Sequence, residues 1–177
     1  MSTRCLNHVE LLHRPGERQL ANRVLALLGC EPVDRGNHWF TSFVDPAGPR
    51  DFVNNTLYAS EVRPEQWAFE QVVMDAASPA RETYLEGLRH APQYSTHFGI
   101  RIDDGDEFEA TLERIREAGQ HDEHLAGRVA LDGVFRPGEP GAIAPNMVQA
   151  FVWTDVVAAG LLCLGQHIEL QHHVAPV

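Results

Sequence analysis

The sequence predicts an α+β fold in which two βαβββ modules form a cupped mixed sheet around a central cavity, with a helical insertion between the modules. The prediction depends on a pattern that occurs twice: a short strand-like segment is followed by an amphipathic helix and then by further strands. The spacing of the two copies is nearly constant. His97 follows His8 by 89 residues, and Gly119 follows Gly29 by 90. Two copies in almost the same register indicate an internal repeat.

The first module is expected to cover residues 1–63. Residues 6–12 are typical of a strand, and the next segment is typical of a helix, because its apolar residues recur at helical spacing. These residues are Leu20, Val24, Leu27 and Leu28. Gly29 is expected to end the helix. Strands are then expected within 31–44 and over 51–62, with turn-forming residues at 45–49 between them.

The second module is expected to cover residues 93–177 and repeats this order. Residues 96–102 predict a strand, and the next helix presents Phe108, Leu112 and Ile115 on one face and ends at Gly119. Asp104 and Glu107 resemble a capping box at the start of that helix. The remaining strands are predicted over 125–135, 148–154 and 166–172, and the Pro- and Gly-containing segment 136–146 is predicted to be an exposed loop.

The insertion between the modules is expected over residues 64–92. Helix-forming residues follow Pro64, so a helix is predicted over 65–77, and a second short helix is predicted over 81–88. Its large apolar residues are expected to pack on the sheet or against a partner subunit, and these are Trp67, Phe69 and Met74. The apolar helix offers a surface for a homodimer, although a monomer is equally consistent with the sequence.

Composition excludes several classes of partner. The chain has 14 Lys+Arg and 25 Asp+Glu, a net charge of −11, and it lacks the basic cluster that nucleic acid or an anionic membrane surface requires. The longest apolar stretch, 156–164, is too short to cross a bilayer, and the first residues do not resemble a secretory signal. The three cysteines (Cys5, Cys30 and Cys163) are widely spaced and are expected to be buried thiols of a cytoplasmic protein.

A candidate metal site follows from three residues on corresponding strands. His8 and His97 occupy matching places in the two modules, so symmetric packing of the modules would bring the imidazoles together. Glu169 lies in the last strand, and a buried carboxylate that faces two imidazoles requires a cation. Two histidines and one carboxylate suit Fe²⁺ and tolerate Zn²⁺, Mn²⁺ or Ni²⁺. The predicted metal ligands are therefore His8, His97 and Glu169.

These segments resemble the vicinal oxygen chelate superfamily, which includes glyoxalases, extradiol dioxygenases and bleomycin-resistance proteins. The resemblance is carried by residues 6–11 (LNHVEL), 95–100 (STHFGI) and 165–170 (GQHIEL), and it spans about residues 5–173 without the insertion. It implies paired βαβββ modules with metal ligands at His8, His97 and Glu169. It further implies a metal-dependent lyase, isomerase or dioxygenase that binds two neighbouring oxygens of a small substrate. A metal-free binding protein of the bleomycin-resistance type is the alternative.

The sequence departs from two branches of that superfamily. Residues 54–60 contain no carboxylate that could be a fourth ligand, and Glu61 comes only at the end of that segment, which argues against a four-ligand glyoxalase site. The second module offers His124 but no tyrosine in its later strands, which argues against ring cleavage. Two roles stay open. His167 is a substitute ligand, a donor to a ligand or part of the cavity wall, and Glu10 is either a site residue or a surface carboxylate. The sequence names no general base.

Overall fold

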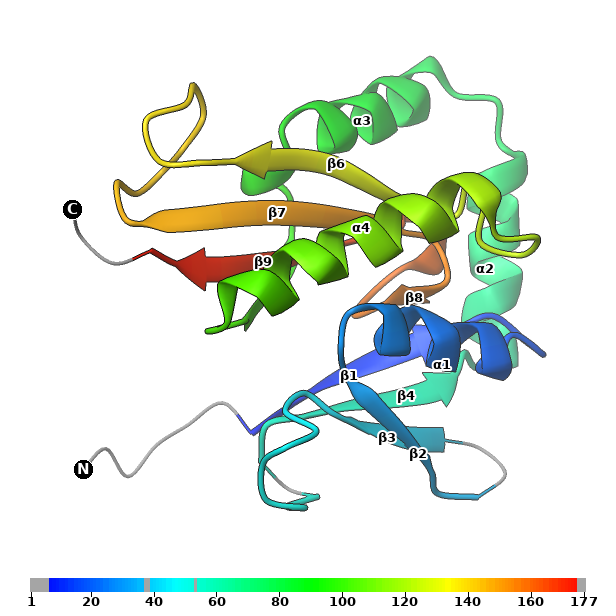
Figure 1. Ribbon diagram of the computed structural model, residues 1–177. Helices are drawn as coiled ribbons and strands as arrows, with labels where there is room; N and C mark the ends of the chain where they lie inside the picture. Colours follow the sequence, from blue (N-terminus) through cyan, green and yellow to red (C-terminus); the bar gives the residue numbers. More distant parts are fainter. Residues whose placement is uncertain (1–6, 37–38, 53, 175–177) are drawn as a thin grey trace.

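The computed structural model describes residues 7–36, 39–52 and 54–174. It contains two βαβββ units in sequence order (Figure 1), so the predicted α+β fold is confirmed. The first unit consists of β1 (His8–His13), α1 (Arg18–Leu27), β2 (Glu31–Asp34), β3 (Trp39–Phe43) and β4 (Thr56–Glu61). The second consists of β5 (His97–Arg101), α4 (Gly105–His121), β6 (Val129–Phe135), β7 (Met147–Thr154) and β9 (Gln166–His173). The remaining elements are α2 (Pro64–Asp75), α3 (Pro79–His90), the two-residue strand β8 (Val157–Ala158) and 3₁₀ turns at Pro92–Tyr94 and Leu162–Leu164.

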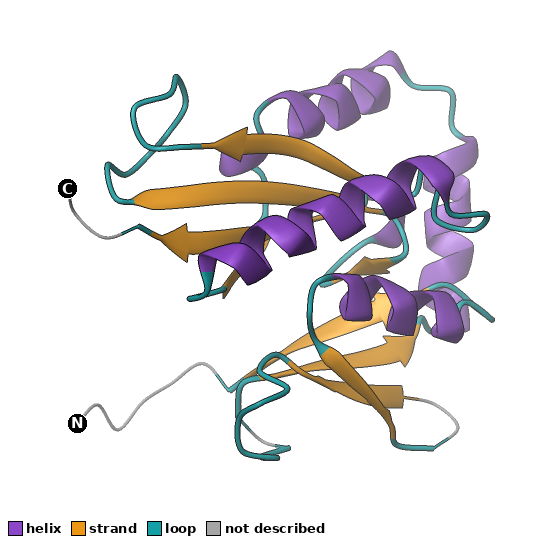
Figure 2. Cartoon of the chain, in the orientation of Figure 1, coloured by secondary structure: helices purple, strands orange, loops and turns teal. Residues whose placement is uncertain are grey.

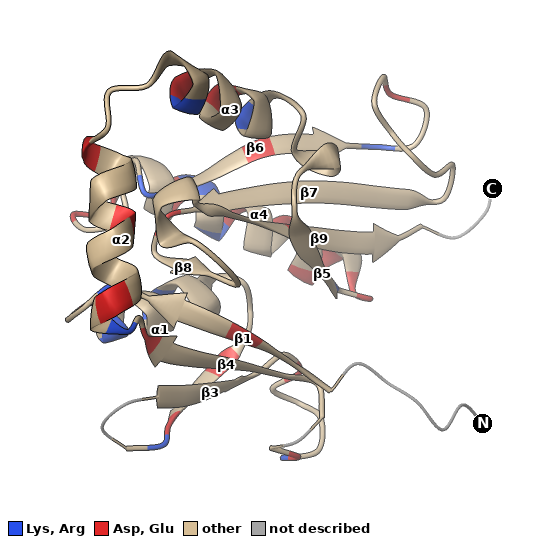
Figure 3. Cartoon of the chain, turned by 180° about the vertical axis from the view of Figure 1, so that it is seen from behind, with Lys and Arg blue, Asp and Glu red and all other residues tan. Residues whose placement is uncertain are grey.

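Both units pair their strands in the same way. The first sheet has the order β2-β3-β4-β1-β8 and the second has the order β5-β9-β7-β6. In each unit the first and last strands are parallel neighbours, β1 with β4 and β5 with β9, and the other pairs are antiparallel. The helices α1 and α4 lie on one side of the two sheets (Figure 2), and Figure 3 shows the sheets from the other side. Cys5, which the sequence predicts to be a buried thiol, lies outside the described residues.

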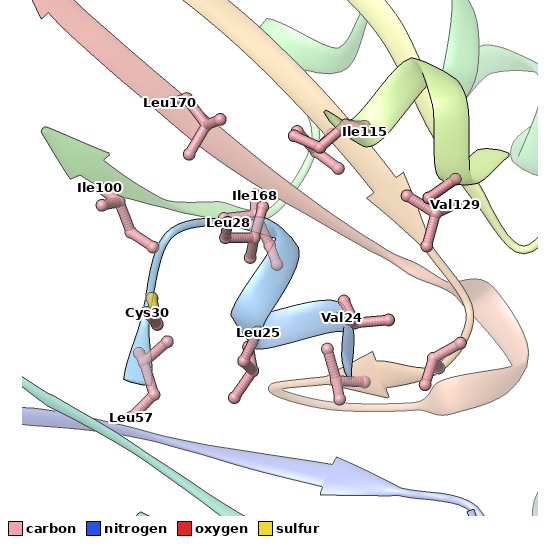
Figure 4. Packing of buried hydrophobic residues seen from close by; sticks show 14 of the residues in the cluster. Val24, Leu25, Leu28, Cys30, Leu57, Ile100, Ile115, Val129, Ile168 and Leu170 are labelled. Carbon is pink, nitrogen blue, oxygen red and sulfur yellow. The ribbon is translucent and has the colours of Figure 1, made fainter. Parts of the chain in front are cut away.

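One apolar core joins the two units. Leu25 of α1 and Leu28, which follows this helix, belong to the same cluster as Ile115 of α4 and Ile168 and Leu170 of β9 (Figure 4). Side chains alternate between the two faces of a strand. Because Ile168 and Leu170 face this core, the residues between them on β9 face the opposite side. That alternation decides which side chains of the second sheet are available for a site.

Most predicted helix signals are confirmed. Gly29 has a φ of 85° and ends α1, and Asp104 caps α4 by accepting a hydrogen bond of 2.8 Å from the backbone N–H of Glu107. Gly119 is different: α4 continues past it to His121, so the predicted helix end at Gly119 is wrong. A Cβ at this position would lie 2.4 Å from the carbonyl oxygen of Val129. The glycine therefore serves close packing of α4 on β6.

Two strands begin later than predicted. β4 begins at Thr56 instead of residue 51, because the preceding residues turn; Asn55 has a φ of 53°, which asparagine tolerates better than most residues. β6 begins at Val129 instead of residue 125. Here the Asp122 carboxylate accepts hydrogen bonds from the backbone N–H groups of His124 and Leu125 and holds a turn.

The insertion consists of two helices: α3 lies beside β6, and α2 lies beside the ends of β1 and β4 (Figure 3). Trp67 of α2 packs against the small apolar cluster that includes Leu162, as predicted, whereas Phe69 is 57% exposed. The buried Glu70 carboxylate fixes α2 to the segment before β9 by accepting a hydrogen bond of 2.7 Å from the backbone N–H of Cys163. No helix in the described parts of the chain is long and apolar enough to cross a membrane.

Candidate functional site

Two of the predicted ligands meet on the second sheet. His97 lies on β5 and Glu169 on the adjacent parallel strand β9, and the His97 Nε2 atom is 3.4 Å from the Glu169 Oε2 atom. The strand register places Glu169 directly beside Gly99. Because Gly99 has no side chain, the imidazole two residues away can reach the carboxylate diagonally. The Glu169 side chain is 6% exposed and the His97 side chain 24%.

Neighbouring groups fix the orientation of both side chains. The His97 Nδ1 atom donates to the backbone carbonyl of Ser95 at 2.8 Å, and the Gln149 amide donates to the Glu169 Oε1 atom at 2.5 Å. A carbonyl oxygen only accepts hydrogen bonds, so Nδ1 carries the hydrogen. In the neutral imidazole, Nε2 then presents a lone pair to a carboxylate oxygen.

This arrangement brings two acceptors together in a largely buried place. Two lone pairs at 3.4 Å repel each other unless a proton or a metal cation lies between them. An imidazole whose second nitrogen donates to a carbonyl, beside a hydrogen-bonded carboxylate, is the usual setting of metal ligands in proteins. The donor set therefore fits two ligand positions of a divalent metal.

Aromatic side chains form the apolar wall of this pair. The Phe151 ring contacts the His97 ring edge-on, with 5.3 Å between the ring centroids, and Phe135 contacts Phe151 in turn. Gly141 makes room for Phe135, since a Cβ there would lie 2.8 Å from the Phe135 ring. Such a wall limits water and strengthens electrostatic interactions beside it.

His8, the third predicted ligand, lies on the first sheet. Its side chain is exposed, and its ring lies 4.8 Å from that of Tyr58. A cavity of about 310 Å³ between the two units is lined by both His8 and His97, together with Thr56 and Phe98. Within the described residues, however, no three His, Cys, Asp or Glu side chains lie close enough to hold a metal ion. The structure thus joins His97 to Glu169 and leaves His8 on the other wall of a cavity that it shares with His97 but not with Glu169.

The residues with open roles lie outside this cavity. His167 is buried and contacts the Asp132 carboxylate at 3.0 Å and the Ser95 hydroxyl at 3.1 Å, so it belongs to a neighbouring hydrogen-bond network. Glu10 is exposed and accepts a hydrogen bond from the Ser60 hydroxyl. Glu61 accepts one from the backbone N–H of Gly16. Neither carboxylate lines the cavity between the units.

Gln149 and Ser95 are the site residues that sequence reasoning missed. Gln149 interrupts the apolar run of β7, between Val148 and Ala150, and it is 3% exposed. A polar residue in such a run is a signal for a buried hydrogen bond. Ser95 acts on His97 through its backbone carbonyl, for which side-chain chemistry gives no signal.

Several solved structures are similar to this chain in fold. A protein from Bacillus anthracis described as a glyoxalase family member aligns over 98% of both chains at 12% identity, with a TM-score of 0.46. The oxidase ChaP-H2 aligns over 99% of this chain and 96% of its own at 17% identity and 0.46. A hypothetical protein from S. aureus gives 11% identity and 0.45 over the same shares.

These likenesses carry no conclusion about activity. No protein-family model and no curated protein matches the sequence. The paired βαβββ fold implied by the resemblance to the vicinal oxygen chelate superfamily is confirmed by the strand order of the chain itself.

Proposed function

We propose that the chain is a metal-dependent enzyme of the glyoxalase and dioxygenase type, which binds a small substrate through two neighbouring oxygens. In this proposal His97 and Glu169 hold a divalent metal, with Fe²⁺ favoured and Zn²⁺, Mn²⁺ or Ni²⁺ as alternatives, and His8 is the third ligand. The observation that carries the proposal is the 3.4 Å approach of two acceptor atoms whose other partners are already fixed.

The size of the cavity beside His97 favours a small substrate. The cavity of about 310 Å³ lies at the lower end of the range for ligand pockets, and both units contribute to its lining. A divalent metal supplies Lewis-acid chemistry, which stabilises negative charge on a substrate oxygen. The chain's own contribution is orientation: Ser95 and Gln149 direct the donor atoms, and Phe151 keeps water from the inner side of the pair. In this proposal, His8 must move toward His97 and Glu169 to complete the three metal ligands.

One observation favours a second function. Only two of the three ligands are in contact, and a proton shared by His97 and Glu169 would satisfy this pair without any metal. The cavity would then bind a small molecule without chemistry, as in a binding protein of the bleomycin-resistance type. The two functions differ in metal content, which can be measured directly.

Metal content tests the proposal. Protein purified without an affinity tag, as isolated and after incubation with Fe²⁺, Mn²⁺, Zn²⁺ or Ni²⁺, is expected to hold about one metal ion per chain by elemental analysis. The variants His97→Ala and Glu169→Gln are expected to lose it, since each removes a fixed ligand, and His8→Ala is expected to weaken it.

The exposed residues His121 and Glu113 of α4 provide matched controls, because His121→Ala and Glu113→Gln change the same residue types away from the cavity. Wild-type protein that takes up none of the four metals would contradict the enzyme proposal and favour the binding protein. Full metal content in both His97→Ala and Glu169→Gln would place the metal elsewhere.

A further inference from the structure

A second polar network lies beside the His97–Glu169 pair, on the same face of the second sheet. It runs from α3 to the turn before β5. The Arg89 guanidinium donates to the Asp132 carboxylate at 2.7 Å, and Asp132 contacts the His167 Nε2 atom at 3.0 Å. The His167 Nδ1 atom lies 3.1 Å from the Ser95 hydroxyl. The side chains of Asp132 and His167 are 6% and 2% exposed, so this network is buried at its centre.

Each residue of the network fixes the orientation of the next side chain. The Asp132 carboxylate only accepts, so His167 donates to it through Nε2, which turns Nδ1 toward the Ser95 hydroxyl. Arg89 is held from its other side by Trp153, with its guanidinium carbon 4.3 Å from the ring centroid. The positions of Asp132 and His167 are therefore fixed from both ends.

The network ends on the residue that orients His97. The Ser95 hydroxyl lies 2.7 Å from the Pro92 carbonyl oxygen, and the Ser95 backbone N–H donates to the same carbonyl at 3.0 Å. The hydroxyl has one hydrogen, so it donates either to the Pro92 carbonyl or to the His167 Nδ1 atom at 3.1 Å, and not to both. The backbone bond to Pro92 and this hydroxyl, placed between two acceptors, hold Ser95 in place. The Ser95 carbonyl is the acceptor for His97 Nδ1 at 2.8 Å, so the tautomer of His97 depends on a backbone group that side chains hold.

We propose that Ser95, His167, Asp132 and Arg89 form a positioning network that keeps the hydrogen of His97 on Nδ1 and its lone pair on Nε2, directed at Glu169. This inference rests on the proposed function, since it assigns a role to residues around the same site. None of these residues touches a substrate in the proposal. They act through His97, and helix α3 of the insertion thereby contributes to the site through Arg89.

The alternative is that the network only stabilises the packing of α3 on the second sheet. Both readings predict some loss of stability when the network is cut. They differ in the tautomer of His97, which a purely structural network would leave unchanged.

Nuclear magnetic resonance of the metal-free protein tests the inference directly. Long-range ¹H–¹⁵N correlation at about pH 8, where imidazoles are generally neutral, distinguishes protonation on Nδ1 from protonation on Nε2. The His97→Gln variant assigns the signals of His97. We expect the His97 Nδ1 atom to carry a hydrogen throughout the population in the wild type and in Ser95→Thr, and in only part of the population in Ser95→Ala and Arg89→Met.

Cobalt binding provides the second measurement. Partners that orient a metal ligand typically change metal affinity by about 10–100-fold when removed, so the dissociation constant of Co²⁺ is expected to rise by this factor in Ser95→Ala and to be restored in Ser95→Thr. Ser60→Ala and Arg116→Met are the controls, because they remove a serine hydrogen bond and an arginine ion pair from exposed places elsewhere.

The outcomes separate this inference from the proposed function. An unchanged His97 tautomer in both Ser95→Ala and Arg89→Met overturns the positioning network, whatever the metal affinity. If Ser95→Ala does not fold, Arg89→Met decides, because it cuts the network at its far end. Wild-type protein that binds no Co²⁺ but shows the expected change of tautomer contradicts the proposed function and supports the network.

Discussion

Cys30 shows how strongly the core acts on a single side chain. The thiol lies immediately before β2 and is 5% exposed. Burial raises its pKa from the ordinary value of 9.0 to about 12, because the apolar surroundings disfavour the thiolate. The prediction of a buried thiol is confirmed for this residue.

Alkaline pH is therefore expected to destabilise the protein through Cys30. Below about pH 9 the folded and unfolded chains both hold the proton. Between about pH 9 and 12 the unfolded chain releases it first, so the free energy of unfolding falls. Cys30→Ala is expected to be less stable than the wild type at neutral pH but to lose less stability as the pH rises. Urea unfolding at several pH values measures this difference.

Val24→Ala is the matched control, because it opens a cavity in the same core without removing a thiol. Its stability is expected to fall with pH as steeply as that of the wild type. Equal slopes for the wild type and Cys30→Ala would show that the thiol does not titrate in this way.

At this scale, two of the predicted side chains do meet, but the groups that orient them were not predicted. His97 and Glu169 were predicted from residue type and from their places in corresponding strands. In the structure, Gly99 lies beside the carboxylate and the Ser95 carbonyl accepts a hydrogen bond from the imidazole. Those contacts depend on strand register and on a turn, which a single sequence does not determine.

At the scale of elements, the helices α4 and α3 each contain a glycine, and the two glycines have different surroundings. Gly119 lies inside the helix where the backbone of β6 comes closest, and Gly87 lies inside α3 with no other atom within 4 Å of a Cβ built there. Glycine weakens a helix in both places, but only Gly119 is required for packing.

Replacing each glycine by alanine is expected to have opposite effects. Gly119→Ala would force a Cβ against the Val129 carbonyl and is expected to destabilise the protein by about 1–3 kcal/mol. Gly87→Ala is expected to stabilise it by about 0.5–1 kcal/mol, since alanine favours the helix and open space receives the methyl group. Thermal unfolding followed by circular dichroism compares both with the wild type. A neutral Gly119→Ala would mean that α4 can move away from β6 at little cost.

Elements with a clear apolar period were the easiest to predict. The helical stripe and glycine end of α1 and the alternation of β9 were recognised correctly, since local spacing determines them. The starts of β4 and β6 were missed, because turns held by Asn55 and by Asp122 occupy residues whose composition fits a strand.

At the scale of the whole molecule, an ion-pair network crosses between the two units. Arg128, which precedes β6, donates two hydrogen bonds of 2.8 and 2.9 Å to the Glu17 carboxylate at the start of α1. It also donates to Asp155 at 2.8 Å, and Asp155 accepts a further bond from Arg14. Burial by itself lowers the pKa of Arg128, but the hydrogen bonds and charges of Glu17 and Asp155 outweigh it and raise the pKa.

Removing Arg128 is expected to weaken the junction of the two units. Arg128→Met removes the guanidinium that Glu17 contacts and leaves Asp155 with Arg14 alone. Because the Arg128 side chain is only 22% exposed, a loss of about 1–3 kcal/mol is expected. Arg116→Met, which breaks an exposed pair with Glu113 on α4, is expected to change stability by less than about 0.5 kcal/mol. Urea unfolding of both variants provides the comparison, and equal losses would contradict a special role of the junction.

The mutual placement of the two units was the part least open to sequence reasoning. The internal repeat predicted two similar halves but not how they pack together. The ion pair between Arg128 and Glu17, for example, joins residues 111 positions apart, and the spacing of apolar residues does not predict such a contact. The same holds for the cavity wall that carries His8, since its distance from the second sheet depends on how the halves pack.

The short strand β8 makes the two halves dependent on each other. Val157 and Ala158 come from the second half of the chain but pair with His13 and Leu12 at the edge of the first sheet. A fragment that ends at residue 63 would lack this strand, and the backbone groups of β1 that it covers would be free to bind another chain. Separate expression of the first half should therefore yield self-associating material.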